Sequence, residues 1–302
     1  MSRALDWNRE GRIWPHREAS RFLELGGATW HIQEMGGGDA SVSKPKALLL
    51  HGTGASVHSW RALMPMLAKD YAVTAMDLPR HAFTRGHPPE AMSLPSMAYK
   101  IARLLDALDL QPDLVIGHSA GAALALQLAL DHRVKAPIAG LNSALRPFPG
   151  PAAQIFPAVA KLLFVNPFVP RVFSKMATFN GEAERFLYRS TGSRIDAEGL
   201  ACYEALLANA RHTKGALAMM ANWDLPTLKT RMGELTNPIL MVHSDRDSAI
   251  PLDWAQEAHA NLPTSELQVL DGLGHLAHEE APERVHAAII RFAQAHASPA
   301  AV

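Results

Sequence analysis

The stretch Leu114–Leu130, LVIGHSAGAALALQLAL, begins as a short apolar run typical of a buried strand and continues with the pattern of a helix. Between the two lies GHSAG, residues 117–121, which matches the G-x-S-x-G motif with Ser119 at its centre. A turn this tight forces the serine into a strained backbone and places its hydroxyl beside the positive end of the helix. The pattern therefore predicts a nucleophile at Ser119 and not a serine that merely caps a helix.

Length and composition indicate a large globular protein. The chain has 302 residues, of which 48% are hydrophobic and 19% charged, enough for a substantial core. Basic and acidic residues balance at 29 each, which argues against a nucleic-acid partner. The single cysteine, Cys202, excludes an internal disulfide and fits a reducing compartment. We expect a cytoplasmic protein with no secretory signal, no transmembrane segment, no metal and no cofactor.

Apolar runs alternate with helical patterns along most of the chain. Two runs on either side of Gly26 and Gly27 predict an antiparallel hairpin. Six later runs predict buried strands, namely ALLL, YAVTAMDLP, PDLVIG, APIAGLN, NPILMVHS and SELQVLDG. Helices are expected at residues 60–68, 97–108, 119–131 and 254–261, and from residue 282 onward. This order predicts an α/β fold with a mostly parallel, eight-stranded sheet and helices on both faces.

Residues 145–235 break the alternation. They contain no strand pattern and are rich in proline, alanine, methionine and phenylalanine. A structureless segment of this length is uncommon inside a compact domain, so we expect a helical lid inserted after the sixth strand. The predicted organisation is a core of residues 1–144 and 236–302 with a lid of residues 145–235.

A serine nucleophile needs a base, and the base needs a carboxylate that orients it. In this architecture they follow in the order Ser, Asp, His, each after a late strand. His275 lies in the loop after the last strand and is the expected base, with His278 as the alternative. Asp247 ends its loop four residues before a proline and is the favoured acid. Asp245 is the alternative acid, or a turn residue bonded to its own backbone.

Two backbone N–H groups are expected to form an oxyanion hole. One belongs to Ala120, the residue after the serine, and the other to Thr53 in the glycine-rich stretch HGTG, with Gly52 as its near neighbour. Several large side chains are candidates for the substrate pocket, with packing of the lid onto the core as the alternative for each. They are Trp60, His118, Met219, Met220 and Trp223, together with Phe148, Phe156 and Phe168.

The motifs HGTG, GHSAG, DRDSAIP and GLGHLAHEE stand in the order found in the α/β-hydrolase superfamily, which the whole chain resembles. More narrowly, REASRFLELGGATWHIQEMG, LLLHGTGASVHSWR, GHSAGAA and ALAMMANWDL resemble the magnesium-chelatase accessory proteins of bacteriochlorophyll biosynthesis. That resemblance implies a role near magnesium insertion into protoporphyrin in a phototrophic bacterium. The candidate pocket residues are compatible with a small hydrophobic substrate such as a tetrapyrrole. Association with magnesium chelatase and peripheral contact with the photosynthetic membrane both stay open at this point. The resemblance implies no particular reaction.

The loop LPRHA departs from the superfamily, where L-P-G-H-G is usual. Arg80 and Ala82 replace glycines, so the backbone must avoid positive φ or be strained by it. Arg80 is expected in solvent, with contact to a substrate propionate as the alternative.

Three functions remain open at this point. The serine in the motif argues against the aspartate nucleophile of dehalogenases and epoxide hydrolases of this fold. The first function is a serine hydrolase that cleaves an ester-like bond through an acyl-enzyme. The second is an accessory protein that holds porphyrin or contacts the chelatase. The third is a C–C bond hydrolase of aromatic catabolism.

Overall fold

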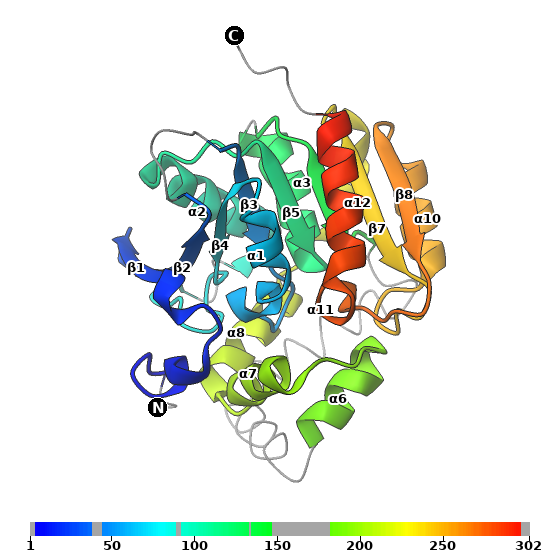
Figure 1. Cartoon of the computed structure of the whole chain (residues 1–302). Coiled ribbons are helices and arrows are strands. Elements are labelled where there is room, and N and C mark those ends of the chain that lie inside the picture. Colours follow the sequence, from blue (N-terminus) through cyan, green and yellow to red (C-terminus); the bar gives the residue numbers. More distant parts are fainter. Residues whose placement is uncertain (1–3, 38–43, 89–91, 133, 147–181, 297–302) are drawn as a thin grey trace.

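One eight-stranded sheet runs through the protein (Figure 1). The computed structural model describes residues 4–37, 44–88, 92–132, 134–146 and 182–296. The sheet has the order β1-β2-β4-β3-β5-β6-β7-β8, and β2 pairs antiparallel with both β1 and β4, while the other pairs are parallel. The strands are β1 Ser20–Leu25, β2 Ala28–Met35, β3 Lys46–Leu50, β4 Ala72–Met76, β5 Leu114–His118, β6 Ile138–Leu141, β7 Ile239–Ser244 and β8 Ser265–Leu270. The predicted hairpin and the six predicted later strands are all present, but β8 was wrongly expected to be buried: it lies at the edge of the sheet, where Glu266 and Val269 are exposed.

Helices cover both faces of the sheet, as predicted. They are α1 Leu63–Leu67, α2 Leu94–Ala107, α3 Ala120–His132, α10 Leu252–Ala260, α11 Ala277–Glu280 and α12 Pro282–Ala295. The helix expected at residues 60–68 is shorter: a 3₁₀ turn, η3 (Val57–Trp60), precedes α1. Pro65 lies in the first turn of α1, where its missing N–H costs little but where it would break a helix that began at residue 60.

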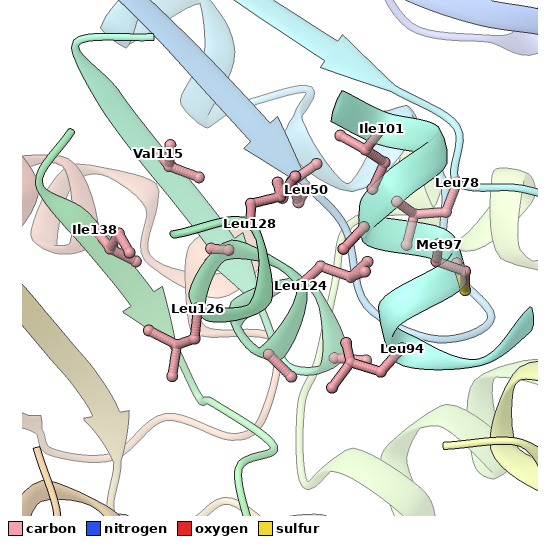
Figure 2. Packing of buried hydrophobic residues seen from close by; sticks show 14 of the residues in the cluster. Leu50, Leu78, Leu94, Met97, Ile101, Val115, Leu124, Leu126, Leu128 and Ile138 are labelled. Carbon is pink, nitrogen blue, oxygen red and sulfur yellow. The ribbon is translucent and has the colours of Figure 1, made fainter. Parts of the chain in front are cut away.

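Side chains that alternate along the strands build two separate cores. Leu48 and Leu50 of β3 belong to the cluster that includes α2 and α3, whereas Leu49 belongs to the cluster that includes α1 and α12. Figure 2 shows Leu124 and Leu128 of α3 beside Leu50, with the labelled side chains of α2 close to them. Burial on both faces explains why these strands are continuous apolar runs in the sequence.

The segment predicted to form the lid is helical where it is described. It contains α6 Glu182–Thr191, α7 Ala197–Leu207, α8 Ala210–Ala221, α9 Leu225–Arg231 and the 3₁₀ turn η5 Met232–Glu234. Figure 1 shows α6, α7 and α8 gathered at one end of the sheet. Phe148, Phe156 and Phe168 lie outside the described residues. The division into core and lid remains a prediction.

The loop after β4 adopts the strained backbone that its sequence allowed. Arg80 and Ala82 have φ of 63° and 41°. Helix α8 supports this loop: the N–H of Ala82 donates to Nδ1 of His212 at 3.0 Å, and Gly215 lies so close that an added Cβ would be 2.2 Å from the carbonyl oxygen of Arg80. Arg80 is half-buried and donates to the carbonyl of His87 at 2.7 Å, which differs from the expected solvated position.

Within the described residues, no helix is both long enough and apolar enough to cross a membrane.

Candidate active site

Ser119 occupies a sharp turn between β5 and α3. Its φ is 53°, a conformation that L-residues other than glycine rarely adopt, and its N–H donates to the carbonyl of Leu141 at 2.9 Å. The flanking glycines permit this turn: an added Cβ would lie 2.4 Å from the Gly121 carbonyl oxygen at Gly117, and 2.0 Å from the Leu50 carbonyl oxygen at Gly121. The strain predicted for the GHSAG turn is therefore present, and the backbone passes close to both of its glycines.

His275 and Asp247 come together from the loops that follow β8 and β7. Nδ1 of His275 lies 2.8 Å from Oδ2 of Asp247, whose side chain is fully buried. The alternative acid, Asp245, is exposed and accepts a hydrogen bond from the N–H of Gly272, in the loop after β8, at 2.6 Å; among the described residues it does not bond to the backbone of its own turn. The structure thus pairs His275 with Asp247.

Asp247 is held ionised by its hydrogen bonds. Burial alone would raise its pKa, but the hydrogen bond and charge of His275, the N–H of Ile250 and the amide of Asn142 together lower the pKa below its usual value. Oδ1 accepts from the N–H groups of Ala249 and Ile250, both at 2.8 Å. An ionised carboxylate can only accept, so Nδ1 of His275 carries the proton and Nε2 is left to accept one.

Asn142 is a site residue that the sequence analysis missed. It follows β6 with φ of 45°, and its Nδ2 donates to Oδ2 of Asp247 at 2.8 Å. The sequence did contain one indication of this role, an asparagine directly after a buried strand. Asparagine tolerates positive φ better than most residues, so this position is typical of a sharp turn at the end of a strand. Asn142 therefore fixes the orientation of the carboxylate together with His275.

The predicted oxyanion-hole donors lie at the same cavity as the serine. Thr53 and Ala120 both line it together with Ser119 and His275. Among the described residues, neither the N–H of Thr53 nor that of Ala120 donates a hydrogen bond, so both are available to a ligand. The hydroxyl of Ser119 makes no hydrogen bond to His275 in the described structure. In enzymes without a bound substrate, the distance between a nucleophile and its base is often longer than a hydrogen bond.

Two cavities meet at Ser119. The larger has a volume of about 570 Å³ and is lined by Met220, Trp223 and Trp254 among other side chains. The smaller, of about 270 Å³, is lined by His118, Tyr203 and Met220, and by further residues of α6 and α8. Both volumes fall at or near the range of small-molecule sites. Three of the predicted pocket residues, His118, Met220 and Trp223, thus line these cavities.

Two more of the predicted pocket residues, both within the described part of the chain, lie elsewhere. Trp60 is fully buried in the core with its ring 4.8 Å from that of His278, and it lines neither cavity. Met219 is also fully buried and accepts a weak hydrogen bond from the hydroxyl of Thr53 at 3.5 Å. Successive residues of a helix point in different directions, so Met220 faces the cavities while Met219 packs inward. In this structure both side chains pack in the hydrophobic core and line neither cavity.

Two further imidazoles lie next to His275. Nε2 of His118 bonds to the carbonyl of His275 at 3.0 Å, and the rings of His118 and His278 are 4.4 Å apart. Burial lowers the pKa of His118 to about 3, and burial with neighbouring positive groups holds the pKa of His278 well below its usual value. Among the described residues His278 makes no hydrogen bond, and its neighbour Glu279 binds Arg61 and Tyr203. His278 is therefore not paired with either aspartate.

Comparison with known proteins agrees with this fold. The model of the alpha/beta hydrolase family matches residues 47–288, which include every strand from β4 to β8 and nearly all of β3. The chain belongs to the alpha/beta hydrolase family. A solved alpha/beta hydrolase fold protein from Burkholderia ambifaria is similar in fold, with a TM-score of 0.74 at 18% identity over 96% of this chain and 100% of that chain.

Among named relatives, this alpha/beta hydrolase is similar to the magnesium-chelatase 30 kDa subunit of Rhodobacter capsulatus. The two are 37% identical over 279 residues, which cover 92% of this chain and 95% of the relative. A 2-hydroxy-6-oxononadienedioate/2-hydroxy-6-oxononatrienedioate hydrolase of Pseudomonas putida is 28% identical over 92% of this chain and 94% of its own length. The narrow resemblance to chelatase-associated proteins is therefore confirmed.

Within the described part of the chain, no three side chains of histidine, cysteine, aspartate or glutamate converge as metal ligands would.

Proposed function

We propose that the protein is a serine hydrolase that cleaves an ester-like bond through an acyl-enzyme. One observation carries the proposal: a histidine that is hydrogen-bonded to a buried, ionised aspartate lines the same cavity as a serine at the strained strand-to-helix turn. A protein that only binds its ligand has no need of this combination.

The residues at the cavity account for each proton in the proposed reaction. The hydroxyl oxygen of Ser119 attacks the substrate carbonyl while Nε2 of His275 takes the proton, and Asp247 stabilises the imidazolium through Nδ1. The N–H groups of Thr53 and Ala120 donate to the oxygen that becomes negative. His275 then returns the proton to the leaving group. In the second half, His275 activates a water that releases the acid and restores the serine.

The cavity supports a substrate with a bulky apolar part. Met220, Trp223 and Trp254 line the larger cavity, where an adaptable methionine and two indole rings suit a flat hydrophobic molecule. Together with the magnesium-chelatase relative, this supports a tetrapyrrole or another hydrophobic metabolite as substrate, and association with magnesium chelatase. We place this activity in the cytoplasm, with contact to the photosynthetic membrane as an open part of the proposal.

Two alternative functions have specific support. The magnesium-chelatase relative favours an accessory protein that holds porphyrin or contacts the chelatase. The dienedioate hydrolase relative favours cleavage of a C–C bond with the same serine. Turnover of a ring-cleavage dienoate would promote the latter, whereas no turnover beside an active esterase would remove it.

The deciding experiment is intact-mass spectrometry after treatment with a fluorophosphonate. Wild type should gain one adduct and Ser119→Ala none, because only an activated serine reacts. Ser248→Ala, which removes an exposed hydroxyl from the loop of the acid, is the matched control and should still be labelled. Circular dichroism would establish that all three proteins are folded. An unlabelled wild type, or a labelled Ser119→Ala, would reject the hydrolase and leave the accessory role.

A further inference from the structure

A hollow separate from the two cavities at Ser119 lies behind the loops that carry Asp247 and His275. It has a volume of about 390 Å³ and is lined by Arg189, Arg194, Arg246, Ser248 and Glu280 among other residues. It shares no lining residue with either cavity at Ser119. Three separate segments meet there: the end of α6 with the turn after it, the loop after β7, and the region from the loop after β8 to α11.

The backbone around the hollow is tightly packed. The carbonyl of Thr191 accepts both the N–H of His275 at 2.8 Å and that of Ser248 at 3.4 Å. Gly192 has φ of 72°, and an added Cβ there would lie 2.5 Å from the carbonyl oxygen of Arg246. The turn after α6 therefore packs directly against the loop that carries Arg246. This contact holds the backbone segments that line the hollow close together.

The hollow has an excess of positive charge. None of the ion pairs formed within the described residues includes Arg189, Arg194 or Arg246. By contrast, Arg185 of the same helix pairs with Glu182 at 2.6 Å. Three guanidinium groups and one carboxylate at the hollow leave an excess of two positive charges.

Glu280 forms no ion pair with an arginine side chain among the described residues, and its oxygens accept hydrogen bonds from other groups. Oε2 accepts from the hydroxyl of Ser193 at 2.9 Å and the N–H of Gly274 at 2.7 Å, while Oε1 accepts from the backbone N–H of Arg194 at 2.8 Å. The guanidinium of Arg194 lies 4.5 Å from the ring centre of Tyr188, which holds it at the hollow. The carboxylate oxygens thus accept from one hydroxyl and two backbone N–H groups, and the guanidinium N–H groups are available to another acceptor.

We propose that this hollow binds a doubly charged oxyanion of the phosphate type. Guanidinium groups offer paired N–H donors that match phosphate oxygens, and a dianion balances the excess charge. The hydroxyl of Ser248 and the volume of the hollow suit a small headgroup. The ligand is either a free phosphate or phosphate monoester, or the headgroup of an acidic phospholipid.

Calorimetric titration with inorganic phosphate tests the site, using Arg246→Gln and Arg189→Gln as variants. Wild type should bind phosphate saturably and prefer it to acetate. Each variant should weaken binding by about tenfold or more, the effect of removing one charge-assisted hydrogen bond. Arg185→Gln, on the same helix but already paired and outside the hollow, should bind as wild type does. Melting temperatures would establish that each variant is folded.

Vesicles distinguish the source of the anion. Phosphatidylcholine vesicles with and without phosphatidic acid would be sedimented with each protein. Retention that depends on phosphatidic acid and on Arg246 would assign the site to a lipid headgroup, while phosphate binding without retention would assign it to a free ligand. Absence of saturable phosphate binding, or equal weakening in Arg185→Gln, would overturn the proposal.

Discussion

Replacing Asp247 with asparagine tests how one carboxylate sets the state of His275. Four donors surround the carboxylate at 2.8 Å: the N–H groups of Ala249 and Ile250 on Oδ1, and those of His275 and Asn142 on Oδ2. An ionised carboxylate accepts all four hydrogen bonds. An asparagine has only one acceptor atom, so one pair of donors must face its NH₂ group.

The rigid backbone decides which pair that is. Since the N–H groups of Ala249 and Ile250 cannot turn away, the new carbonyl oxygen should face them, and the NH₂ group should face His275. Nδ1 must then accept, so the proton moves to Nε2 and the imidazole can no longer take the proton of Ser119. We expect kcat to fall about 10⁴-fold, which is about 5.4 kcal/mol of barrier. The buried contact between the two amide groups should also cost about 1–3 kcal/mol of stability.

The assay compares kcat for p-nitrophenyl butyrate and the rate of fluorophosphonate labelling in Asp247→Asn and Asp245→Asn. Asp245 is exposed and accepts only one described hydrogen bond, from Gly272, so its variant should remain within about threefold of wild type. Turnover above about a tenth of wild type in Asp247→Asn would refute the reasoning, as would an equal loss in the control.

Two predictions concern stability. Gly121→Ala should lower the free energy of unfolding in urea by about 1–3 kcal/mol, because its Cβ would lie 2.0 Å from the Leu50 carbonyl oxygen. Gly233→Ala, with nothing within 4 Å of the added Cβ, should change it by less than about 1 kcal/mol, and equal midpoints would contradict the close approach. Acid should destabilise the protein because burial lowers the pKa of His212 to about 3, while the unfolded histidine titrates near 6.5. The unfolded state then binds more protons, so this stability is complete above pH 6.5 and is lost as the pH falls toward 3. The loss between pH 7 and pH 5 should be about 2 kcal/mol smaller in His212→Gln than in wild type, and identical losses would contradict the assignment.

Local patterns in the sequence were sufficient for the sheet and for the strained serine. Strands β3, β5 and β7 are buried on both faces, so their apolar runs are visible without knowledge of their neighbours. The GHSAG motif predicted a tight, strained turn at Ser119, and this turn is present. The helix at residues 60–68 was placed too early because Pro65 sets where α1 begins.

Contacts between distant segments could not be predicted in this way. The sequence placed Asp245 and Asp247 in one loop, but only the packing of β7 against β8 decides which of them meets His275. Asn142 reaches that carboxylate across 105 positions of the chain. Trp60 and Met219 were candidates for the pocket by residue type, yet they point into the core because the direction of a side chain depends on how its helix docks.

The sequence by itself determined the order of strands and helices, the strained turn at Ser119 and the family, because these depend on side-chain periodicity and on backbone freedom within a few residues. Only the tertiary structure decided the partners of Asp247, the walls of the two cavities at Ser119 and the meeting of Arg189, Arg194 and Arg246 in one hollow. These features bring together segments that are separated by tens to hundreds of residues, and their geometry follows from how the sheet and helices close around one another.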